Sequence, residues 1–259
     1  MRVQTLFSLE GQVALITGGS RGLGRKIAEA LGELGAKLVI VARTQSELTA
    51  AVHSLRDAGV DATGLSFDLS GDGDIAGLVD SAIEAYGRID ILVNNAGTSW
   101  AQPAEEHSLE GWRKVMTLNV DVAFNLSREV GRREMIPRGA GKIVNIASVG
   151  GLRGNRPEHA AYTLAYSTSK GALVNFTRAL ACEWGRYGVN VNALCPGFFR
   201  SKLADHLLER IETSLLEATP LKRIGTEDDF KGAAAFLCSA ASQHMTGQVL
   251  VIDGWITAC

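Results

Sequence analysis

The sequence predicts an α/β fold in which a doubly wound sheet of about seven parallel strands carries helices on both faces. Apolar runs of strand length recur along the chain, and amphipathic stretches of helical length separate them. The runs are almost wholly apolar instead of alternating, which indicates burial on both faces, and the helices between them supply right-handed crossovers. No proline-rich or serine-rich linker divides the chain, so residues 1–259 are expected to form a single Rossmann-type domain.

The expected elements follow in chain order. Strands are predicted at VALIT (13–17), KLVIVA (37–42), TGLSFDL (63–69), IDILVNN (89–95), KIVNIAS (142–148), VNVNALC (189–195) and VLVID (249–253). Apolar stripes at helical spacing predict a helix in RKIAEALGELG (25–35), and another in YSTSKGALVNFTRALACEW (166–184). A surface helix is expected between the second and third strands, where the apolar stripe consists of Leu48, Ala51, Val52 and Leu55.

The composition, 46% hydrophobic and 21% charged, is that of a globular protein and excludes disorder. A formal charge of −2 gives no global field that would attract nucleic acid or an anionic membrane. No apolar run approaches the ~20 residues that span a bilayer. The four cysteines and five histidines lack the spacing of metal ligands, so no metal is expected. These features predict a cytoplasmic protein whose partner is a small molecule.

A glycine-rich loop, TGGSRGLG (17–24), connects the first strand to the first long helix. Glycines let the backbone approach a pyrophosphate closely, and the N-terminus of the following helix offers unpaired N–H groups. The loop is therefore a candidate dinucleotide site, although turns and close helix packing also need glycine, and the spacing departs from G-x-G-x-x-G. The candidate contacts are Gly18, Ser20, Arg21, Gly22, Leu23 and Gly24.

Several motifs, taken together, resemble the short-chain dehydrogenase/reductase family over essentially the whole chain. They are TGGSRGLG (17–24), NNAG (94–97), Asn119, Ser148 and YSTSK (166–170). The resemblance implies a nicotinamide-dependent oxidoreductase in which Asn94 stabilises the sheet. The cofactor contacts that it implies are Asn95, Ala96 and Gly97 along the cofactor, Asp68 and Leu69 at the adenine, and the backbone near Phe199 and the hydroxyl of Ser201 at the nicotinamide carboxamide.

The end of the second strand bears on the choice of cofactor. Rossmann proteins that use NAD generally carry an acid there, about twenty residues beyond the loop, for the ribose 2′-hydroxyl. Here the strand ends on Ala42, and Arg43 and Arg21 could both bind a 2′-phosphate through planar, charge-assisted hydrogen bonds. This pattern favours NADP(H) over NAD(H). The alternative is that both arginines are simply solvated.

Tyr166 and Lys170 are four residues apart in a predicted helix, so both side chains occupy one face. A phenol is a poor acid or base near neutral pH, but an adjacent ammonium favours phenolate, so Lys170 is expected to activate Tyr166. An isolated pair of this kind is usually a half-buried ring beside a solvated charge. The resemblance favours catalysis instead, and it implies that Lys170 also holds the nicotinamide ribose, Ser148 binds the substrate oxygen, and Asn119 anchors a water that relays protons.

Two segments at the carboxyl ends of strands, around 149–165 and 198–220, are predicted to form substrate loops and a lid. Ser148 and Tyr166 are eighteen positions apart, more than in most family members, so the first segment holds extra residues. The basic residues there, which either bind a substrate carboxylate or phosphate or merely solvate the loop, are Arg153, Arg156 and His159.

Several large apolar side chains near the predicted site have two interpretations. In the second segment, the residues that either close over the ligand or pack in the core are Phe198, Phe199, Leu203, Leu207 and Leu208. Trp100 either caps the pocket or is a buried structural residue. Near the end of the chain, Trp255 replaces a glycine that is common in the family, in a tail that lies near a subunit interface in related tetramers. A homotetramer is expected by resemblance, and otherwise a dimer.

These features predict an NADP(H)-dependent oxidoreductase that interconverts a secondary alcohol and a ketone by hydride transfer, with Tyr166 as general acid and base. The longer loop and RALACEWGRYGVNVNALCPGFF (178–199) resemble the gluconate 5-dehydrogenase-like branch of the family, which implies a polyol or sugar acid as the substrate. Reduction of a 3-oxoacyl thioester is the alternative. A nonenzymatic NADP(H)-binding regulator is an alternative from a different class, but it would not need the complete acid-base group.

Overall fold

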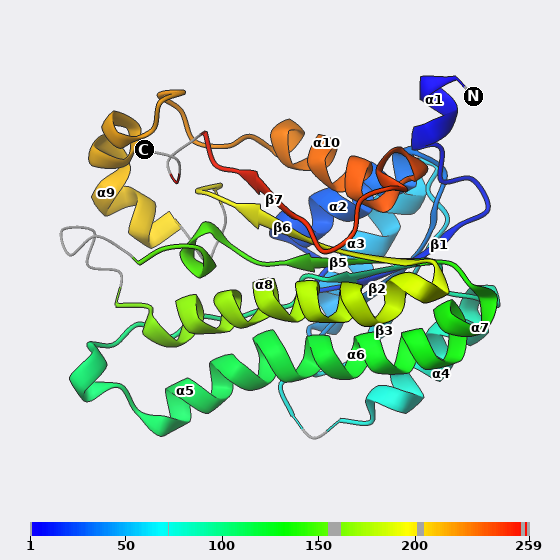
Figure 1. The fold of residues 1–259 in the computed structure, drawn as a ribbon, viewed down its shortest axis with the longest axis horizontal. Coiled ribbons are helices and arrows are strands. Elements are labelled where there is room, and N and C mark those ends of the chain that lie inside the picture. Colours follow the sequence, from blue (N-terminus) through cyan, green and yellow to red (C-terminus); the bar gives the residue numbers. More distant parts are fainter. Residues whose placement is uncertain (1, 72, 155–161, 201–204, 255–256, 258–259) are drawn as a thin grey trace.

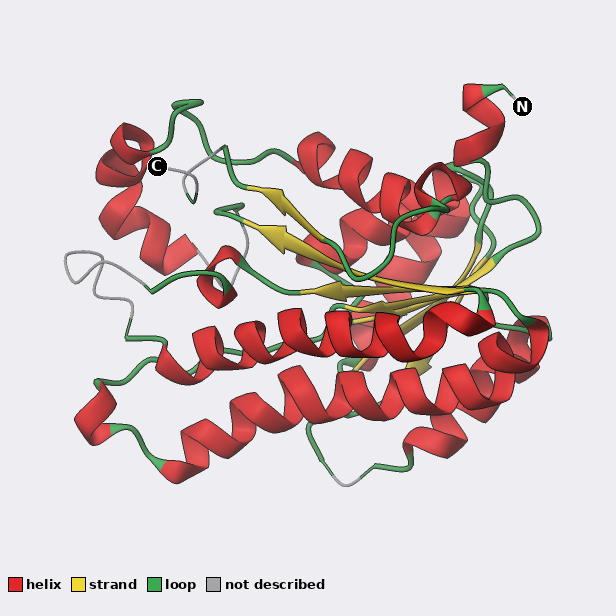
Figure 2. Cartoon of the chain, in the orientation of Figure 1, coloured by secondary structure: helices red, strands yellow, loops and turns green. Residues whose placement is uncertain are grey.

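The computed structural model describes residues 2–71, 73–154, 162–200, 205–254 and 257. Its strands form a seven-stranded parallel sheet in the order β3-β2-β1-β4-β5-β6-β7 (Figures 1 and 2). The strands are β1 (Val13–Thr17), β2 (Lys37–Ala42), β3 (Ala62–Ser66), β4 (Ile91–Asn94), β5 (Gly141–Ile146), β6 (Val189–Pro196) and β7 (Val249–Ile252). The strand order reverses between β1 and β4, and ligands of open parallel sheets bind beyond the carboxyl ends of strands at such a point.

The predicted fold class is confirmed, and the first two strands have the predicted bounds. The third strand is shorter than expected, because it pairs with β2 alone and that register ends at Ala42 opposite Ser66. The fourth strand likewise covers only Ile91–Asn94 of the predicted 89–95. The residues that follow these strands, including Asp68 and Asn95, therefore lie in loops at the carboxyl edge.

Helices cover both faces of the sheet (Figure 1). Their bounds are α1 (Val3–Phe7), α2 (Gly22–Glu33), α3 (Gln45–Asp57), α4 (Ile75–Tyr86), α5 (Leu109–Met116), α6 (Val122–Val130), α7 (Ile136–Arg138), α8 (Leu164–Trp184), α9 (Asp205–Ala218) and α10 (Glu227–Cys238). On one face, α2, α3 and α10 bury Ile16 and Ile40, and on the other α4 and α6 pack over Leu15 and Val39. Neighbouring strand residues thus point to opposite faces, and both faces are apolar, as the sequence predicts.

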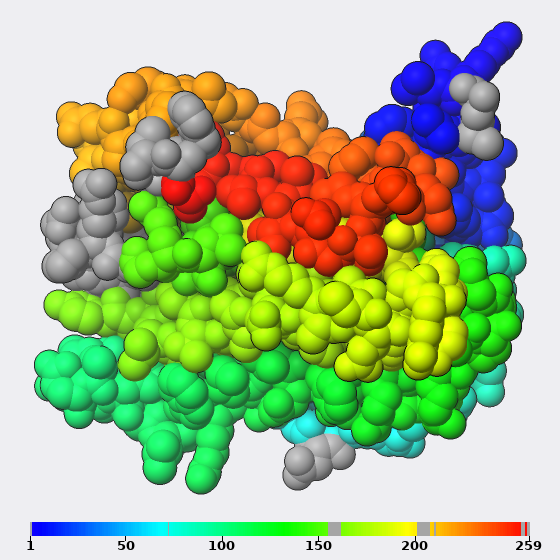
Figure 3. All heavy atoms as spheres, in the orientation of Figure 1, coloured from blue at the N-terminus to red at the C-terminus, as the bar shows by residue number. Residues whose placement is uncertain are grey.

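The remaining elements frame this core. A π turn, η2 (Thr117–Asp121), links α5 to α6, so the two helices continue into one another. β7 is an edge strand, and it contributes to the surface beside α8 (Figure 3). Among the residues that the structure describes, none of the helices combines the length and the apolarity needed to cross a bilayer.

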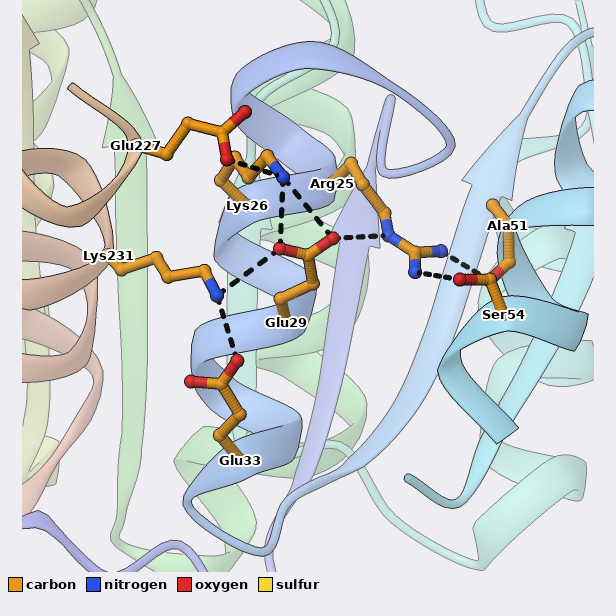
Figure 4. Close-up of polar contacts among 8 residues, drawn as sticks. All are labelled: Arg25, Lys26, Glu29, Glu33, Ala51, Ser54, Glu227 and Lys231. Atoms are coloured by element: carbon orange, nitrogen blue, oxygen red, sulfur yellow. Dashed lines mark hydrogen bonds and ion pairs between the residues drawn. The ribbon is translucent and has the colours of Figure 1, made fainter. Parts of the chain in front are cut away.

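A network of charged side chains fixes α2, the helix that follows the glycine loop, against its neighbours (Figure 4). Glu29 accepts hydrogen bonds from Arg25 (3.0 Å) and Lys26 (3.2 Å), and it pairs with Lys231 of α10 (3.3 Å). Arg25 in turn donates to the Ser54 hydroxyl of α3 (3.1 Å). Burial acts to raise the pKa of Glu29, but these cations hold it below its ordinary value. The network therefore ties three helices of one layer together.

Phe230 fastens α10 to the segment after β6. Its side chain is fully buried, and its ring meets the ring of Phe199 edge to face with 5.5 Å between centroids. Gly225 packs against the Phe199 ring at a point where a Cβ atom would overlap it, and its N–H donates to the Phe198 carbonyl (3.0 Å). This packing fixes Gly225, just before α10, against the residues that directly follow β6.

We expect Phe230→Ala to lower the free energy of unfolding by about 3–5 kcal/mol, because the buried ring leaves a cavity. Urea unfolding followed by circular dichroism measures this change. The matched control is Leu221→Ala, whose side chain is 62% exposed and which should cost less than about 1 kcal/mol. Equal losses in the two variants would contradict the packing role of Phe230.

Candidate active site

The predicted motifs converge at the carboxyl edge of the sheet, around the point where β1 and β4 lie side by side (Figure 1). The glycine loop follows β1, NNAG closes β4, and Ser148 follows β5. The first two turns of α8 bring Tyr166 and Lys170 to the same place.

The glycine loop has the shape of a cradle for a phosphate group. Gly18 and Gly22 both adopt positive φ, at +65° and +53°. A Cβ atom on Gly24 would overlap the Gly18 carbonyl and the Asn95 amide, whereas nothing lies within 4 Å of such an atom on Gly22. No side chain caps α2 at Arg21, in contrast to α4, α5 and α10, whose N-cap side chains accept hydrogen bonds. The first N–H groups of α2 are thus available to an anion, so these residues fit the pyrophosphate of a dinucleotide.

Thr17 and Asn95 brace the loop from behind. The N–H groups of Asn95 and Ala96 each donate to the Thr17 hydroxyl (3.0 Å), and the Asn95 amide donates to the carbonyls of Thr17 (2.8 Å) and Gly18 (3.2 Å). The Asn95 side chain therefore shapes the cofactor loop. Thr17 belongs to the predicted loop but was not among the candidate contacts, although a polar residue at the end of a buried apolar strand is a usable signal.

Asn94 ties β4 to its surroundings, as the resemblance implies. Its amide donates to Asn145 Oδ1 of β5 (2.8 Å) and to the Ser127 hydroxyl of α6 (3.1 Å). All three side chains are buried, so these bonds are protected from water.

The predicted ribose site lies at the end of β2. Ala42 is buried and Arg43 is exposed. Arg21 lies 3.4 Å from a carboxylate oxygen of Glu47, in the first turn of α3. No acid is present at the end of β2 itself. Glu47 was not predicted to lie near Arg21, because its carboxylate belongs to the next helix, α3.

The predicted adenine contacts differ in exposure. Asp68 is exposed, and it accepts hydrogen bonds from the Ser70 N–H (2.9 Å) and hydroxyl (2.6 Å). These bonds, together with the charge of Arg43, hold the pKa of Asp68 below its ordinary value. Leu69 is buried, so it contributes to the floor of this region.

Tyr166 and Lys170 share one face of α8, as predicted. The Lys170 ammonium nitrogen lies 5.6 Å from the centre of the Tyr166 ring and donates to the Ile146 carbonyl (2.7 Å). The Lys170 side chain is buried, and burial lowers its pKa to about 8. The expectation of a lowered pKa for Tyr166 is not met in this structure. Burial raises the pKa of Tyr166, and the opposing hydrogen bond with Ser148 is the smaller effect.

Asn119 links the loop after β4 to α8. It lies buried in the π turn, accepts from the Thr98 N–H (2.8 Å), and donates to the Thr98 carbonyl (3.0 Å) and the Ser169 hydroxyl (2.9 Å). Ser169 donates in turn to the Tyr166 carbonyl (2.7 Å). π turns are frequent at functional sites. Ser169 lies within YSTSK, but the sequence did not reveal that it connects Asn119 to Tyr166, because only Tyr166 and Lys170 of this motif had been given roles.

Gly97 shows how closely these groups approach one another. A Cβ atom on it would lie 3.2 Å from Asn119 Oδ1 and 3.6 Å from the Lys170 ammonium nitrogen. The absence of a side chain at this position leaves space beside both polar groups, as a cofactor lying along the loop would require.

Ser148 begins a short 3-10 turn after β5. Its hydroxyl oxygen accepts from the Gly150 N–H (3.1 Å), which leaves the hydroxyl proton for another partner. A hydrogen bond with Ser148 also acts on Tyr166, and the Ser148 backbone bonds to the buried Cys195 thiol. Burial raises the pKa of Cys195 to about 11, so this thiol stays neutral. The structure thus brings Asn119, Ser148, Tyr166 and Lys170 together.

The apolar residues around the site are mostly packing residues. The Trp100 ring lies against Gly111, where a Cβ atom would be 2.6 Å from it, and the Lys114 ammonium lies 5.2 Å from the ring centre. Trp100 is only partly buried, however, so it is not the fully buried structural residue of the second interpretation. Phe199 and Leu208 are buried, which favours core packing for both. The predicted site residues that lie outside the described residues are Arg156, His159, Ser201, Leu203 and Trp255, and the side chain of Leu207 is likewise not described.

Comparisons with known proteins agree with this geometry. A family model described as enoyl-(acyl carrier protein) reductase matches residues 18–257. The gluconate 5-dehydrogenase of Gluconobacter oxydans is 40% identical over 254 residues, which cover 97% of each chain. The rhamnolipids biosynthesis 3-oxoacyl-(acyl-carrier-protein) reductase of Pseudomonas aeruginosa is 38% identical over 255 residues, which cover 96% of this chain and 97% of the relative. A crystal structure of a gluconate 5-dehydrogenase from Burkholderia cenocepacia in complex with NADP and tartrate is 36% identical, covers 100% of each chain and superposes with a TM-score of 0.93.

The family model spans most of the chain, and both relatives match this chain along nearly their whole length. Apart from Thr17, which precedes it by one position, the motifs of the resemblance lie within the matched region, and the sheet that carries them is shared with a solved dehydrogenase. The chain therefore belongs to the short-chain dehydrogenase/reductase family and is an oxidoreductase enzyme that acts on alcohol and carbonyl groups.

Proposed function

We propose that the enzyme interconverts a secondary alcohol and a ketone of a sugar acid, with NADP(H) as its cofactor and Tyr166 as general acid and base. The observation that carries this proposal is the convergence of Tyr166, Lys170, Ser148 and Asn119 beside a glycine loop with an uncapped helix. A nonenzymatic regulator would have no use for such a cluster.

The proposed cofactor site runs along the carboxyl edge from Arg43 to Phe199. The glycine loop and the N-terminus of α2 would hold the pyrophosphate. Arg43, exposed beside the buried Ala42, would hold the 2′-phosphate. The relative crystallised with NADP supports this choice.

In the proposed reaction, the bound nicotinamide supplies or accepts the hydride. Tyr166 donates its phenolic proton to the carbonyl oxygen in reduction and accepts it in oxidation. The hydroxyl of Ser148 donates a hydrogen bond to the same oxygen as negative charge develops on it. The Lys170 ammonium favours phenolate once Tyr166 has given up its proton. Asn119 holds Thr98 and Ser169 in position around this group.

Two classes of substrate are candidates for the proposed reaction. The gluconate 5-dehydrogenase relatives favour a sugar acid, whose carboxylate would meet the basic residues Arg153, Arg156 and His159 of the 149–165 loop. The 3-oxoacyl carrier-protein reductase relative and the family model favour an acyl thioester as the second candidate. We also propose that the 198–220 segment bounds the substrate pocket.

We further propose that the enzyme works as a homotetramer in the cytoplasm, or otherwise as a dimer. Among the strands that the structure describes, β7 lies at the edge and pairs with β6 alone, and the Phe124 side chain on α6 is 47% exposed, so both offer surface for a symmetric interface. The free thiols of Cys182, Cys195 and Cys238 fit a reducing compartment.

Removal of the Tyr166 hydroxyl tests the chemistry. We expect Tyr166→Phe to lower kcat for D-gluconate oxidation with NADP+ by about a thousandfold, because the substitution removes the phenol that accepts the alcohol proton in the proposed reaction. NADPH binding, measured by calorimetric titration, should be retained. Parallel assays of the wild type and the variant with a 3-oxoacyl thioester and NADPH identify which of the two substrate classes the enzyme uses. A variant as active as the wild type on either substrate would refute the role of Tyr166.

Lys170 predicts a pH limit for carbonyl reduction. Burial lowers its pKa to about 8, so the ammonium is present below that pH and is lost above it. Burial raises the pKa of Tyr166, which keeps the phenol protonated over the same range. We expect kcat/KM for reduction to be flat from about pH 6 to 7.5 and to fall through about pH 8. In Lys170→Arg, whose side chain keeps its charge, the remaining activity should lose this alkaline limb. If the alkaline limb were unchanged in Lys170→Arg, a group other than Lys170 would be the one that titrates near pH 8.

The assignment of the 2′-phosphate predicts an unequal effect of Arg43→Ala. We expect the Kd of NADPH to rise about tenfold or more and the Kd of NADH to change less than about twofold, because only NADPH carries the phosphate. Titration of the purified enzyme with each nucleotide measures both constants. Similar losses for the two nucleotides would mean that Arg43 does not contact the phosphate.

A further inference from the structure

A carboxylate from α3 lies next to Arg21, although no acid follows β2 directly. Glu47 lies in the first turn of α3, and its Oε1 is 3.4 Å from Nη1 of Arg21, the N-cap residue of α2. The ion pair therefore joins the starts of the two helices that flank β2. The side chains remain 59% exposed at Arg21 and 36% exposed at Glu47, so a ligand can reach both from solvent.

We propose that Glu47 is a specificity-determining residue, and that its pairing with Arg21 weakens the preference of the enzyme for NADP(H) over NAD(H). This inference rests on the proposed cofactor function. In this proposal, the charge of Glu47 opposes binding of the 2′-phosphate. We therefore expect the enzyme to bind both NADP(H) and NAD(H).

The physical reason is competition for one guanidinium. A 2′-phosphate that reaches the end of β2 would carry nearly two negative charges toward Arg43 and Arg21. Glu47 already neutralises Arg21, so the phosphate must either displace the carboxylate or lie close to it. In an exposed setting, one such charge conflict changes binding by about three- to tenfold.

NAD(H) meets no such conflict. Its 2′-hydroxyl is neutral and can donate a hydrogen bond to a carboxylate, which is the role that an acid at the end of the second strand generally fills in NAD-binding folds. Glu47 can supply that acceptor from α3. The charge of Glu47 thus acts in opposite directions on the two nucleotides.

Binding to the full-length enzyme, measured without turnover, tests this proposal. We expect Glu47→Gln to lower the Kd of NADPH about three- to tenfold and to leave the Kd of NADH unchanged or raised. The gain for NADPH should shrink at high salt, because exposed charges are screened. Glu47→Asp keeps the charge and should stay close to the wild type. The matched control is Glu84→Gln, the same substitution at an exposed position of α4.

The result that overturns the proposal is a Glu47→Gln enzyme in which both Kd values move by the same factor, or in which neither moves. The route through Arg21 is tested by repeating the substitution in an Arg21→Met background, where the gain for NADPH should largely disappear. A gain of full size in that background would overturn the pairing with Arg21. A wild-type enzyme that binds neither nucleotide would instead refute the proposed function, so the two failures are distinguishable. Circular dichroism of each variant verifies that it is folded.

Discussion

The site depends on one buried cation, the ammonium of Lys170. It lies between the carbonyl of Ile146 at the end of β5 and the ring of Tyr166 one helical turn before it. An ammonium in such a place is costly to keep charged, which is why its pKa falls to about 8. The same burial raises the pKa of Tyr166. In this geometry, the Tyr166 phenol is neutral in the enzyme alone. Any further positive charge nearby strongly favours its ionisation.

The rest of the carboxyl edge keeps this pair in place and prepares the surface beside it. The bonds from Asn119 through Ser169 to the Tyr166 carbonyl run from the loop after β4 to α8. The bonds between Thr17 and Asn95 hold the glycine loop against the end of β4. Farther along α2, the charge network centred on Glu29 fixes the helix against α3 and α10. A dinucleotide laid along this edge would contact parts that already have their final positions.

Most of the fold could be predicted from sequence because buried parallel strands leave a simple signal. Val13–Thr17 and Lys37–Ala42 are apolar runs apart from one polar residue at an end of each, and their bounds are those of β1 and β2. The motif spacing also predicted that Tyr166 and Lys170 share one helical face, as they do in α8. The family resemblance pointed to Ser148 and Asn119, which lie beside them, and the catalytic roles of the four residues stay a proposal. What the sequence could not give depends on distances between segments. Glu47 reaches Arg21 across 26 positions, and Thr17 reaches Asn95 across 78. The raised pKa of Tyr166 was not predicted, because burial, which depends on the whole fold, outweighs the opposing hydrogen bond with Ser148.

The central claim is that the phenol of Tyr166 ionises in response to positive charge beside a buried ammonium. Ultraviolet difference titration of the wild type against Tyr166→Phe isolates this phenol from the other three of the four tyrosines. We expect it to ionise only above the usual range of a tyrosine phenol in the enzyme alone, since burial raises its pKa, and to ionise at clearly lower pH when NADP+ is saturating, because the added positive charge favours phenolate. An ionisation at the same pH with and without NADP+ would contradict the account.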